Sequence, residues 1–208
     1  MSRRFVIVGT DTGVGKTIFS AALVGALGAS YWKPVQAGLE EETDSQIVAR
    51  LSGAPASRIL PESWRLRRPA SPNLAARDEG VVIDVSKLDP PICDSHLIIE
   101  MAGGVMSPLA DDALPTDLLA RWRFPIIIVA RTTIGTINHS LLTLEALRRR
   151  AIPIIGVVFV GDDESEAEHT IEVMGNVRRL GRLPRLAKLD MVSLHAAFDA
   201  AFDLRDFA

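Results

Sequence analysis

The chain has 208 residues, of which 48% are hydrophobic, and a formal net charge of −3, which suits one well-packed domain. The slightly acidic balance excludes a general basic field, so neither nucleic acid nor an anionic membrane surface is an expected partner. Cys93 is the sole cysteine and no apolar run approaches the ~18 residues of a membrane span, so a reducing cytoplasmic location is expected.

The first motif is a glycine-rich segment, GTDTGVGKT at residues 9–17, between an apolar run, Phe5–Val8, and an expected helix, Lys16–Leu27. This is the setting of a phosphate-binding loop, because backbone N–H groups at a helix N-terminus attract anions. Lys16 is placed to reach the terminal phosphates of a nucleotide, and Thr17 is placed to bind Mg²⁺. The first glycine comes one residue earlier than in the usual pattern, but the context still predicts a nucleotide phosphate site.

Apolar runs alternate with helical patterns along the rest of the chain. The further expected strands are a weak run at Tyr31-Trp32 with Val35, stronger runs at His96–Ile99, Pro125–Ala130 and Pro153–Val160, and a short strand that begins at Gly181 and is followed by a tight loop. The further expected helices are Asp44–Leu51, Asn73–Glu79, Thr116–Trp122, Asn138–Arg150, Glu164–Leu180 and Met191–Phe202. Continuous β-branched runs are typical of strands that are buried on both faces. The pattern predicts an α/β fold in which helices flank both faces of a mostly parallel sheet.

Three charged residues follow the expected strands, where ligands gather in parallel sheets. Lys33 follows the second strand, and a phosphate-binding cation and a solvated lysine are equally good interpretations. Asp44 stands at the expected start of a helix. Two interpretations are open: either Thr43 or Asp44 caps the helix, or Asp44 binds Mg²⁺. Glu100 follows the third strand and precedes two glycines, as a second Mg²⁺-associated acid would. Because a buried unpaired carboxylate is costly, Glu100 is expected to reach a partner or the edge of the sheet.

Two other segments lie between the predicted elements. Residues 53–72 are rich in proline and arginine and are expected to form a long surface excursion, either over a site or as a mere connection. Asn138 is the expected N-cap of a helix, and free N–H groups around Gly135–Asn138 could bind a carboxylate. His139 is interpreted as a structural residue of the first helical turn, because no carboxylate partner is evident that would orient it as a base.

In chain order these segments resemble the dethiobiotin synthetase family, over nearly the whole chain. The family pattern Gly-Thr-Asp-Thr-x-Val-Gly-Lys-Thr matches residues 9–17, including the early glycine. The other matching segments are Lys33-Pro34-Val35, Asp44 at a Ser/Thr-Asp position, Ser71-Pro72, Glu100 with Ala102-Gly103-Gly104, residues 135–139 as Gly-x-Ile-Asn-His, and Gly181 with Pro184-Arg185-Leu186. Each match is short, and the ordered series is what makes the resemblance specific.

The resemblance implies a single-domain P-loop NTPase-like fold over residues 1–208 and an ATP-dependent cyclo-ligase of biotin biosynthesis. Such an enzyme forms the cyclic urea of dethiobiotin from 7,8-diaminononanoate, CO₂ and ATP, with Mg²⁺. One substrate amine captures CO₂ as a carbamate, the carbamate accepts the γ-phosphoryl group, and the neighbouring amine closes the ring and releases phosphate. The resemblance also implies a homodimer in which the second subunit binds the distant carboxylate of the substrate.

Site residues follow from the same resemblance. Those implied for ATP and its metal complex are Gly13, Val14, Gly15, Lys16, Thr17, Ile18, Asp44, Glu100, Gly103, Pro184, Arg185 and Leu186, with Thr17, Asp44 and Glu100 as Mg²⁺ ligands. Those implied for the substrate are Thr12, Lys33, Ala37, Gly135, Thr136 and Asn138. Lys16 and Lys33 are the implied catalytic residues, which stabilise charge on the transferring phosphoryl group and on the carbamate.

Three positions depart from the family pattern. Ala37 stands where the family often has a hydroxyl, and Met101 stands where it has a glycine. After the fifth strand the family often has an asparagine that reads adenine, whereas this chain has Phe159-Val160-Gly161-Asp162. We therefore expect appreciable use of nucleoside triphosphates other than ATP.

Two competing classes share a phosphate-binding loop. Regulatory ATPases of the partition and septum-positioning kind carry a second lysine early in that loop, where this chain has Asp11-Thr12. A related amidoligase, or a nucleotide-binding module without turnover, is the other alternative. A glutamine-dependent amidoligase needs a cysteine nucleophile, and Cys93 is poorly suited because no partner for it is evident.

Overall fold

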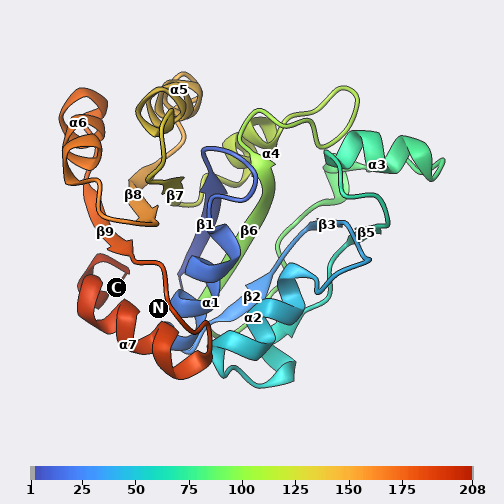
Figure 1. The fold of residues 1–208 in the computed structure, drawn as a ribbon. Helices are drawn as coiled ribbons and strands as arrows, with labels where there is room; N and C mark the ends of the chain where they lie inside the picture. Colours follow the sequence, from blue (N-terminus) through green and yellow to red (C-terminus); the bar gives the residue numbers. More distant parts are fainter. Residues whose placement is uncertain (1–2, 208) are drawn as a thin grey trace.

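The computed structural model describes residues 3–207 as a parallel β-sheet between two layers of helices (Figure 1). The main sheet has seven strands in the order β4-β2-β6-β1-β7-β8-β9, and all neighbouring strands pair in parallel. These strands are β1 (Arg4–Gly9), β2 (Ser30–Trp32), β4 (Ile59–Leu60), β6 (Leu97–Gly104), β7 (Ile126–Arg131), β8 (Ile154–Val160) and β9 (Arg179–Leu183). A separate parallel pair is formed by β3 (Val35–Ala37) and β5 (Trp64–Leu66).

Helices alternate with the strands along the chain. The α-helices are α1 (Lys16–Leu27), α2 (Asp44–Ser52), α3 (Pro72–Asp78), α4 (Pro115–Trp122), α5 (Thr136–Arg148), α6 (Ser165–Gly175) and α7 (Met191–Ala201). Short 3₁₀ helices are η1 (Ala56–Arg58), η2 (Val85–Lys87) and η3 (Leu204–Phe207). None of the helices within residues 3–207 is long and apolar enough to cross a membrane.

Two hydrophobic cores lie on opposite faces of the sheet, because successive strand residues point to opposite sides. In β1, Phe5 and Ile7 belong to the core that α1, α2 and α7 cover. Val6 and Val8 belong to the core on the side of α3, α4, α5 and α6. Strands that are buried on both faces explain the continuous apolar runs of the sequence. The prediction of a mostly parallel sheet with helices on both faces is therefore confirmed.

Three segments near the site fold differently from the sequence prediction. The third strand was expected to end at Ile99, but β6 continues to Gly104 and carries Glu100 inside it. The second strand is divided at Lys33-Pro34 into β2 and β3, which belong to different sheets. Pro34 has no N–H to donate to a ladder, which fits a break at this point. Residues 53–72 are not only a connection, because β4 extends the main sheet and β5 pairs with β3.

Two helix boundaries also differ from the prediction. The helix expected over residues 164–180 ends at Gly175, because Asn176 takes a left-handed conformation with φ 39° and β9 follows soon after. The expected N-cap at Asn138 is wrong: Gly135, with φ 90°, precedes the first helical residue, Thr136, and Asn138 lies in the first turn. In both cases a left-handed residue sets the boundary, which apolar periodicity does not reveal.

Candidate functional site

The phosphate loop joins β1 to α1 at the carboxyl edge of the sheet. Gly15 is the residue before α1, with φ 97°, and no side chain caps the helix there. The N–H groups of the first turn of α1 are therefore not engaged by a capping side chain, and an anion is their natural partner. Gly13 also has a positive φ, 72°, and a Cβ added there would meet nothing within 4 Å.

The early glycine of the motif has a steric cause. A Cβ on Gly9 would lie 2.6 Å from the Asp11 carbonyl oxygen and 2.7 Å from Lys16 Nζ. The loop therefore folds back so closely over the end of β1 that position 9 has no room for a side chain. The Lys16 ammonium donates a hydrogen bond to the Asp11 carbonyl oxygen at 2.9 Å and is thereby held across the loop. Burial lowers the pKa of Lys16, although the nearby Glu100 carboxylate opposes that shift.

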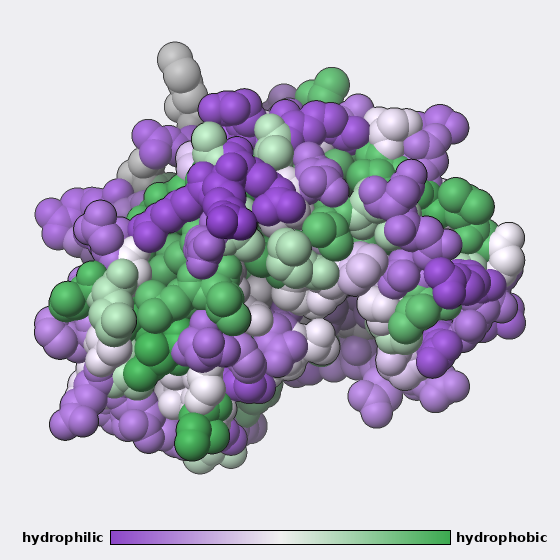
Figure 2. All heavy atoms as spheres, turned by 90° about the horizontal axis from the view of Figure 1, so that it is seen from above, coloured by the Kyte–Doolittle hydropathy of each residue, from purple (hydrophilic) through white to green (hydrophobic). Residues whose placement is uncertain are grey.

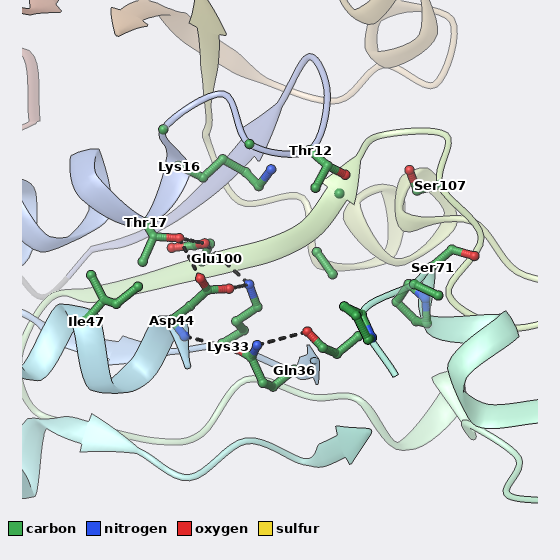
Figure 3. A pocket seen from close by; sticks show the side chains of 18 of the residues that line it. Thr12, Lys16, Thr17, Lys33, Gln36, Asp44, Ile47, Ser71, Glu100 and Ser107 are labelled. Atoms are coloured by element: carbon green, nitrogen blue, oxygen red, sulfur yellow. Dashed lines mark hydrogen bonds and ion pairs between the residues drawn. The ribbon is translucent and has the colours of Figure 1, made fainter. Parts of the chain in front are cut away.

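Beside the loop, two carboxylates, a hydroxyl and an ammonium converge from α1, α2, β6 and the end of β2 (Figure 3). Thr17 Oγ1 lies 2.9 Å from Asp44 Oδ1 and 2.8 Å from Glu100 Oε1. Lys33 Nζ contacts Asp44 Oδ2 and lies 3.4 Å from Glu100 Oε1. Glu100 is fully buried and Lys33 nearly so, so the expectation that Glu100 reaches a partner is confirmed.

The charges of this cluster depend on one another. Burial alone would lower the pKa of Lys33, but Glu100 and Asp44 outweigh it and raise that pKa above its ordinary value. Burial alone would raise the pKa of Asp44, but the charge and hydrogen bond of Lys33, together with Thr17, lower it. Both groups are therefore charged near neutral pH.

The sheet register explains why these groups meet. Glu100 of β6 pairs with Ile7 of β1, two residues before the loop begins. β2 lies on the other side of β6, so Lys33, which follows β2, is delivered to the same edge. Asp44 begins α2, whose N-cap is Thr43 in a capping box with Gln46, as one of the sequence alternatives proposed.

The oxygen atoms of the cluster suit a hard cation. Thr17 has one hydroxyl proton and cannot donate it to both carboxylates at once. Oxygen atoms from Thr17, Asp44 and Glu100 thus face one another, with one hydroxyl proton and the Lys33 ammonium between them. Carboxylate and hydroxyl oxygens are ligands that Mg²⁺ accepts. Within residues 3–207 no group of three or more His, Cys, Asp or Glu side chains forms a metal cluster, so a cation here would also need phosphate or water ligands.

A cavity of about 620 Å³ extends from this cluster along the phosphate loop. Of the residues predicted for the site, it is lined by Thr12, Gly13, Gly15, Lys16, Thr17, Ile18, Lys33, Ala37, Asp44, Glu100 and Gly103. The structure thus brings together residues from the first half of the chain that the family resemblance assigned to the nucleotide, the metal and the substrate. Ser71 and Ser107 face the cavity from the side opposite Asp44 (Figure 3).

The other predicted site residues lie outside this cavity. Val14 is buried in the core beneath the loop. Gly135, Thr136 and Asn138 lie at the start of α5, and residues 184–186 follow β9. The end of β8, the strand beside β9, does reach the loop, because a Cβ on Gly15 would lie 2.7 Å from Val160 Cγ1.

Several lining residues were not assigned to the site from the sequence. They are Gln36, Ile47, Pro69, Ala70, Ser71, Pro72, Ala102 and Ser107. Gln36 is the most connected: its amide nitrogen donates to the Ala37 and Gly38 carbonyl oxygens, and its amide oxygen accepts from the Asp44 backbone N–H. Its position in the short strand after Lys33 was a usable signal, because polar residues near strand ends face ligands in this kind of sheet.

Comparison with known proteins gives consistent results. A family model described as an AAA domain matches residues 3–193. The ATP-dependent dethiobiotin synthetase of Agrobacterium fabrum is 61% identical over 100% of this chain and 98% of its own length. The synthetase of the same name from Rhizorhabdus wittichii is 59% identical over 100% of both chains. Among solved structures, a ParA family ATPase from Chlorobium tepidum has a TM-score of 0.50 at 13% identity, covering 96% of this chain and 91% of its own. The MinC:MinD complex of Aquifex aeolicus has a TM-score of 0.51 at 13% identity, covering 94% of this chain and 86% of its own. At such identities these two matches show the fold alone.

Proposed function

Because the chain belongs to the ATP-dependent dethiobiotin synthetase family, we propose that its main cavity is the place where the cyclic urea of dethiobiotin is closed. The chain is accordingly a ligase of biotin biosynthesis that uses ATP and a diaminononanoate substrate. We further propose that residues 1–208 act as one ligase domain in the cytoplasm, where ATP is supplied. The observation that carries the site assignment is the convergence of Lys16, Lys33, Asp44 and Glu100 on one wall of the cavity.

The geometry supports a division of labour among these residues. The uncapped N-terminus of α1 and Lys16 bind the phosphates of ATP. Lys33 lines the cavity beside the carboxylates of Asp44 and Glu100, where its ammonium stabilises negative charge on a carbamate and on the γ-phosphoryl group that the carbamate accepts. The carbamate oxygen forms a bond to phosphorus as ADP leaves, and the second amine then attacks the carbamoyl carbon and expels phosphate. Both amines belong to one molecule, so ring closure gains from proximity.

We propose that Thr17, Asp44 and Glu100 hold Mg²⁺ together with the nucleotide phosphates. Their oxygen atoms converge, and the shared hydroxyl proton leaves one carboxylate incompletely satisfied. When bound, Mg²⁺ would neutralise charge that develops on the β- and γ-phosphates. Lys16 would then stabilise charge on the phosphates, and Lys33 would stabilise charge on the carbamate.

A single assay tests the reaction. The protein is incubated with 7,8-diaminononanoate, bicarbonate, Mg²⁺ and ATP, and dethiobiotin is sought by mass spectrometry. We expect product, with ADP release that depends on the diamine and on CO₂ or bicarbonate. ATP turnover without product and without dependence on the diamine would contradict the proposal and favour a regulatory ATPase.

We predict appreciable turnover with nucleoside triphosphates other than ATP. Asp162 stands two residues after β8 and Arg185 two residues after β9, and these two exposed side chains are ion-paired at 3.1 Å. A carboxylate accepts only and a guanidinium donates only, so neither offers the adjacent donor and acceptor of an asparagine amide. A site built to hydrogen-bond its substrate discriminates by about 10⁴-fold or more, whereas we expect less than about 100-fold here. The measurement is kcat/KM with ATP, CTP, GTP and UTP. A strict preference for ATP would contradict the prediction.

We also propose that the chain acts as a homodimer whose interface includes the start of α5. Figure 2 shows hydrophobic residues gathered on the side of the molecule where α5 and α6 lie. The exposed apolar side chains of α5, of α6 and of the turn before α5 include Ile134, Leu142, Val173 and Met174. Exposed apolar surface is typical of interaction sites. Such an interface would let Gly135, Thr136 and Asn138 of one subunit serve the substrate of the other.

Changing Ile134 to Asp tests the interface. Ile134 is 99% exposed in the described chain, so a carboxylate costs nothing in an isolated subunit but is disfavoured when buried between subunits. We expect the variant to shift toward monomer in light scattering after size-exclusion chromatography and to raise KM for the diamine. Ile92 to Asp is the matched control, because Ile92 is 94% exposed in the loop before β6. A monomeric wild type, or a dimeric Ile134 variant, would contradict the proposal.

A further inference from the structure

Tyr31 is a buried polar side chain in contact with the site that the sequence did not indicate. It lies in the middle of β2 and has no exposed surface. Its hydroxyl donates a hydrogen bond to Glu100 Oε2 at 3.1 Å. The other oxygen of the same carboxylate, Oε1, accepts from Thr17 and faces Lys33. Tyr31 therefore occupies the half of the carboxylate that the rest of the cluster leaves free.

The register of the sheet explains why a tyrosine is needed for this contact. Tyr31 pairs with Ile98 of β6, so Glu100 lies two residues further along the neighbouring strand, on the same face. Two residues of a strand span about 6.6 Å. A tyrosine side chain bridges that distance, whereas serine or threonine in the same position would fall short. The aromatic ring packs meanwhile in the core that α1 and α2 cover.

We propose that Tyr31 is a positioning residue for the reaction, whose hydroxyl holds Glu100 with Oε1 turned toward Thr17 and so sets the affinity for the metal–nucleotide complex. This inference rests on the proposed Mg²⁺ site at Thr17, Asp44 and Glu100. Tyr31 itself touches neither nucleotide nor substrate, because it does not line the cavity. A hydrogen bond from a fully buried donor removes the rotational freedom of a carboxylate before the cation arrives, which is how groups behind a metal ligand tune affinity.

The phenol remains a donor at working pH. Burial, followed by the charges of Glu100 and Asp44, raises the pKa of Tyr31 well above its ordinary value. Its single proton therefore stays on the hydroxyl. Within residues 3–207 this hydroxyl makes no other hydrogen bond, so Glu100 Oε2 is its acceptor.

The test is Tyr31→Phe, which removes the hydroxyl and keeps the ring. Mn²⁺ serves as the probe, and its binding in the presence of a non-hydrolysable ATP analogue is followed by electron paramagnetic resonance. We expect Mn²⁺ affinity to fall about tenfold, in line with the loss of a hydrogen bond to a charged group. Binding of the analogue without metal and KM for the diamine are expected to stay unchanged, and kcat is expected to recover at high Mg²⁺. A general loss of structure would instead weaken Mn²⁺ binding, metal-free nucleotide binding and diamine binding together.

Two substitutions at the same position sharpen the result. 4-Aminophenylalanine restores a donor and is expected to restore Mn²⁺ affinity, whereas 4-methylphenylalanine fills the space without donating and is expected to behave like Phe. Ser30→Ala is the matched control, since Ser30 is the neighbouring buried residue and its hydroxyl bonds to Ser95, away from the cluster. We expect Ser30→Ala to leave Mn²⁺ affinity unchanged.

Three outcomes would overturn the inference. Wild-type Mn²⁺ affinity in Tyr31→Phe or in the 4-methylphenylalanine variant would show that the hydroxyl does not position Glu100. Equal weakening of metal-free nucleotide binding would assign Tyr31 a purely structural role. If the Glu100→Gln variant binds Mn²⁺ as tightly as the wild type does, the proposed metal site is wrong, and the role proposed for Tyr31 is wrong with it.

Discussion

Lys33→Ala is expected to retain nucleotide binding and to lose most turnover. Lys33 Nζ contacts Asp44 and lies 3.4 Å from Glu100 at the wall of the cavity, whereas the phosphate loop with Lys16 is formed without it. A preorganised charge in a water-poor site contributes far more in the transition state than a surface lysine does, and removing one such group lowers kcat by about 10²–10³-fold. The measurements are the rate of dethiobiotin formation and ATP affinity by isothermal titration calorimetry.

The same substitution leaves the fully buried Glu100 carboxylate and the partly exposed Asp44 carboxylate without their ammonium. Uncompensated buried charge is destabilising, on the order of 3–5 kcal/mol, so thermal unfolding is followed with and without Mg²⁺ and ATP. We expect the metal complex to recover part of the stability but not the turnover. Lys87→Ala is the matched control, because Lys87 is exposed and its one ion pair within residues 3–207 is with Asp84. Unchanged turnover in Lys33→Ala would remove Lys33 from the mechanism.

The charged half of the site could be predicted because each of its residues stands in a local pattern. Lys16 and Thr17 belong to a loop between a strand and a helix, Lys33 follows an apolar run, and Asp44 begins a helix beside a capping residue. In a parallel sheet such positions meet at one edge, so the order of these residues along the chain was sufficient to predict that they share a site. The position of Glu100 inside β6 could not be predicted, because a strand that continues through glycines loses its apolar signal.

The rest of the site depends on tertiary pairing that leaves no local pattern. Ser71 and Ser107 reach the cavity because β3 and β5 pair as a second small sheet and because β6 runs on to Gly104. Tyr31 was part of a weak apolar run, and only the pairing of β2 with β6 brings its hydroxyl to Glu100. Long-range register of this kind follows from packing, not from residue type.

Gly15→Ala is expected to weaken nucleotide binding strongly while the rest of the sheet stays folded. Gly15 has φ 97°, where a side chain is strained by about 1–2 kcal/mol. An added Cβ would also lie 2.7 Å from Val160 Cγ1 and 2.9 Å from Val160 Cβ, which the strand β8 holds in place. The N-terminus of α1 must therefore move away from β8. Losing two N–H bonds to a charged phosphate, at about 1.5–3 kcal/mol each, weakens ATP binding by more than about 100-fold.

Two further variants separate strain from collision. Gly80→Ala places a side chain at φ 64° in the turn after α3, where nothing lies within 4 Å, so it is expected to cost stability alone and to leave ATP affinity unchanged. Combining Gly15→Ala with Val160→Ala removes both Val160 γ-carbons, the nearer of which lies 2.7 Å from the added Cβ. We expect the double variant to recover part of the ATP affinity. Recovery is incomplete because the backbone strain and the contact with Val160 Cβ persist. Calorimetric titration with ATP and thermal unfolding measure the two effects separately. If Gly15→Ala bound ATP as tightly as the wild type, α1 would not need its close contact with β8 to bind phosphate, and the assignment of the helix N-terminus as the phosphate site would be wrong.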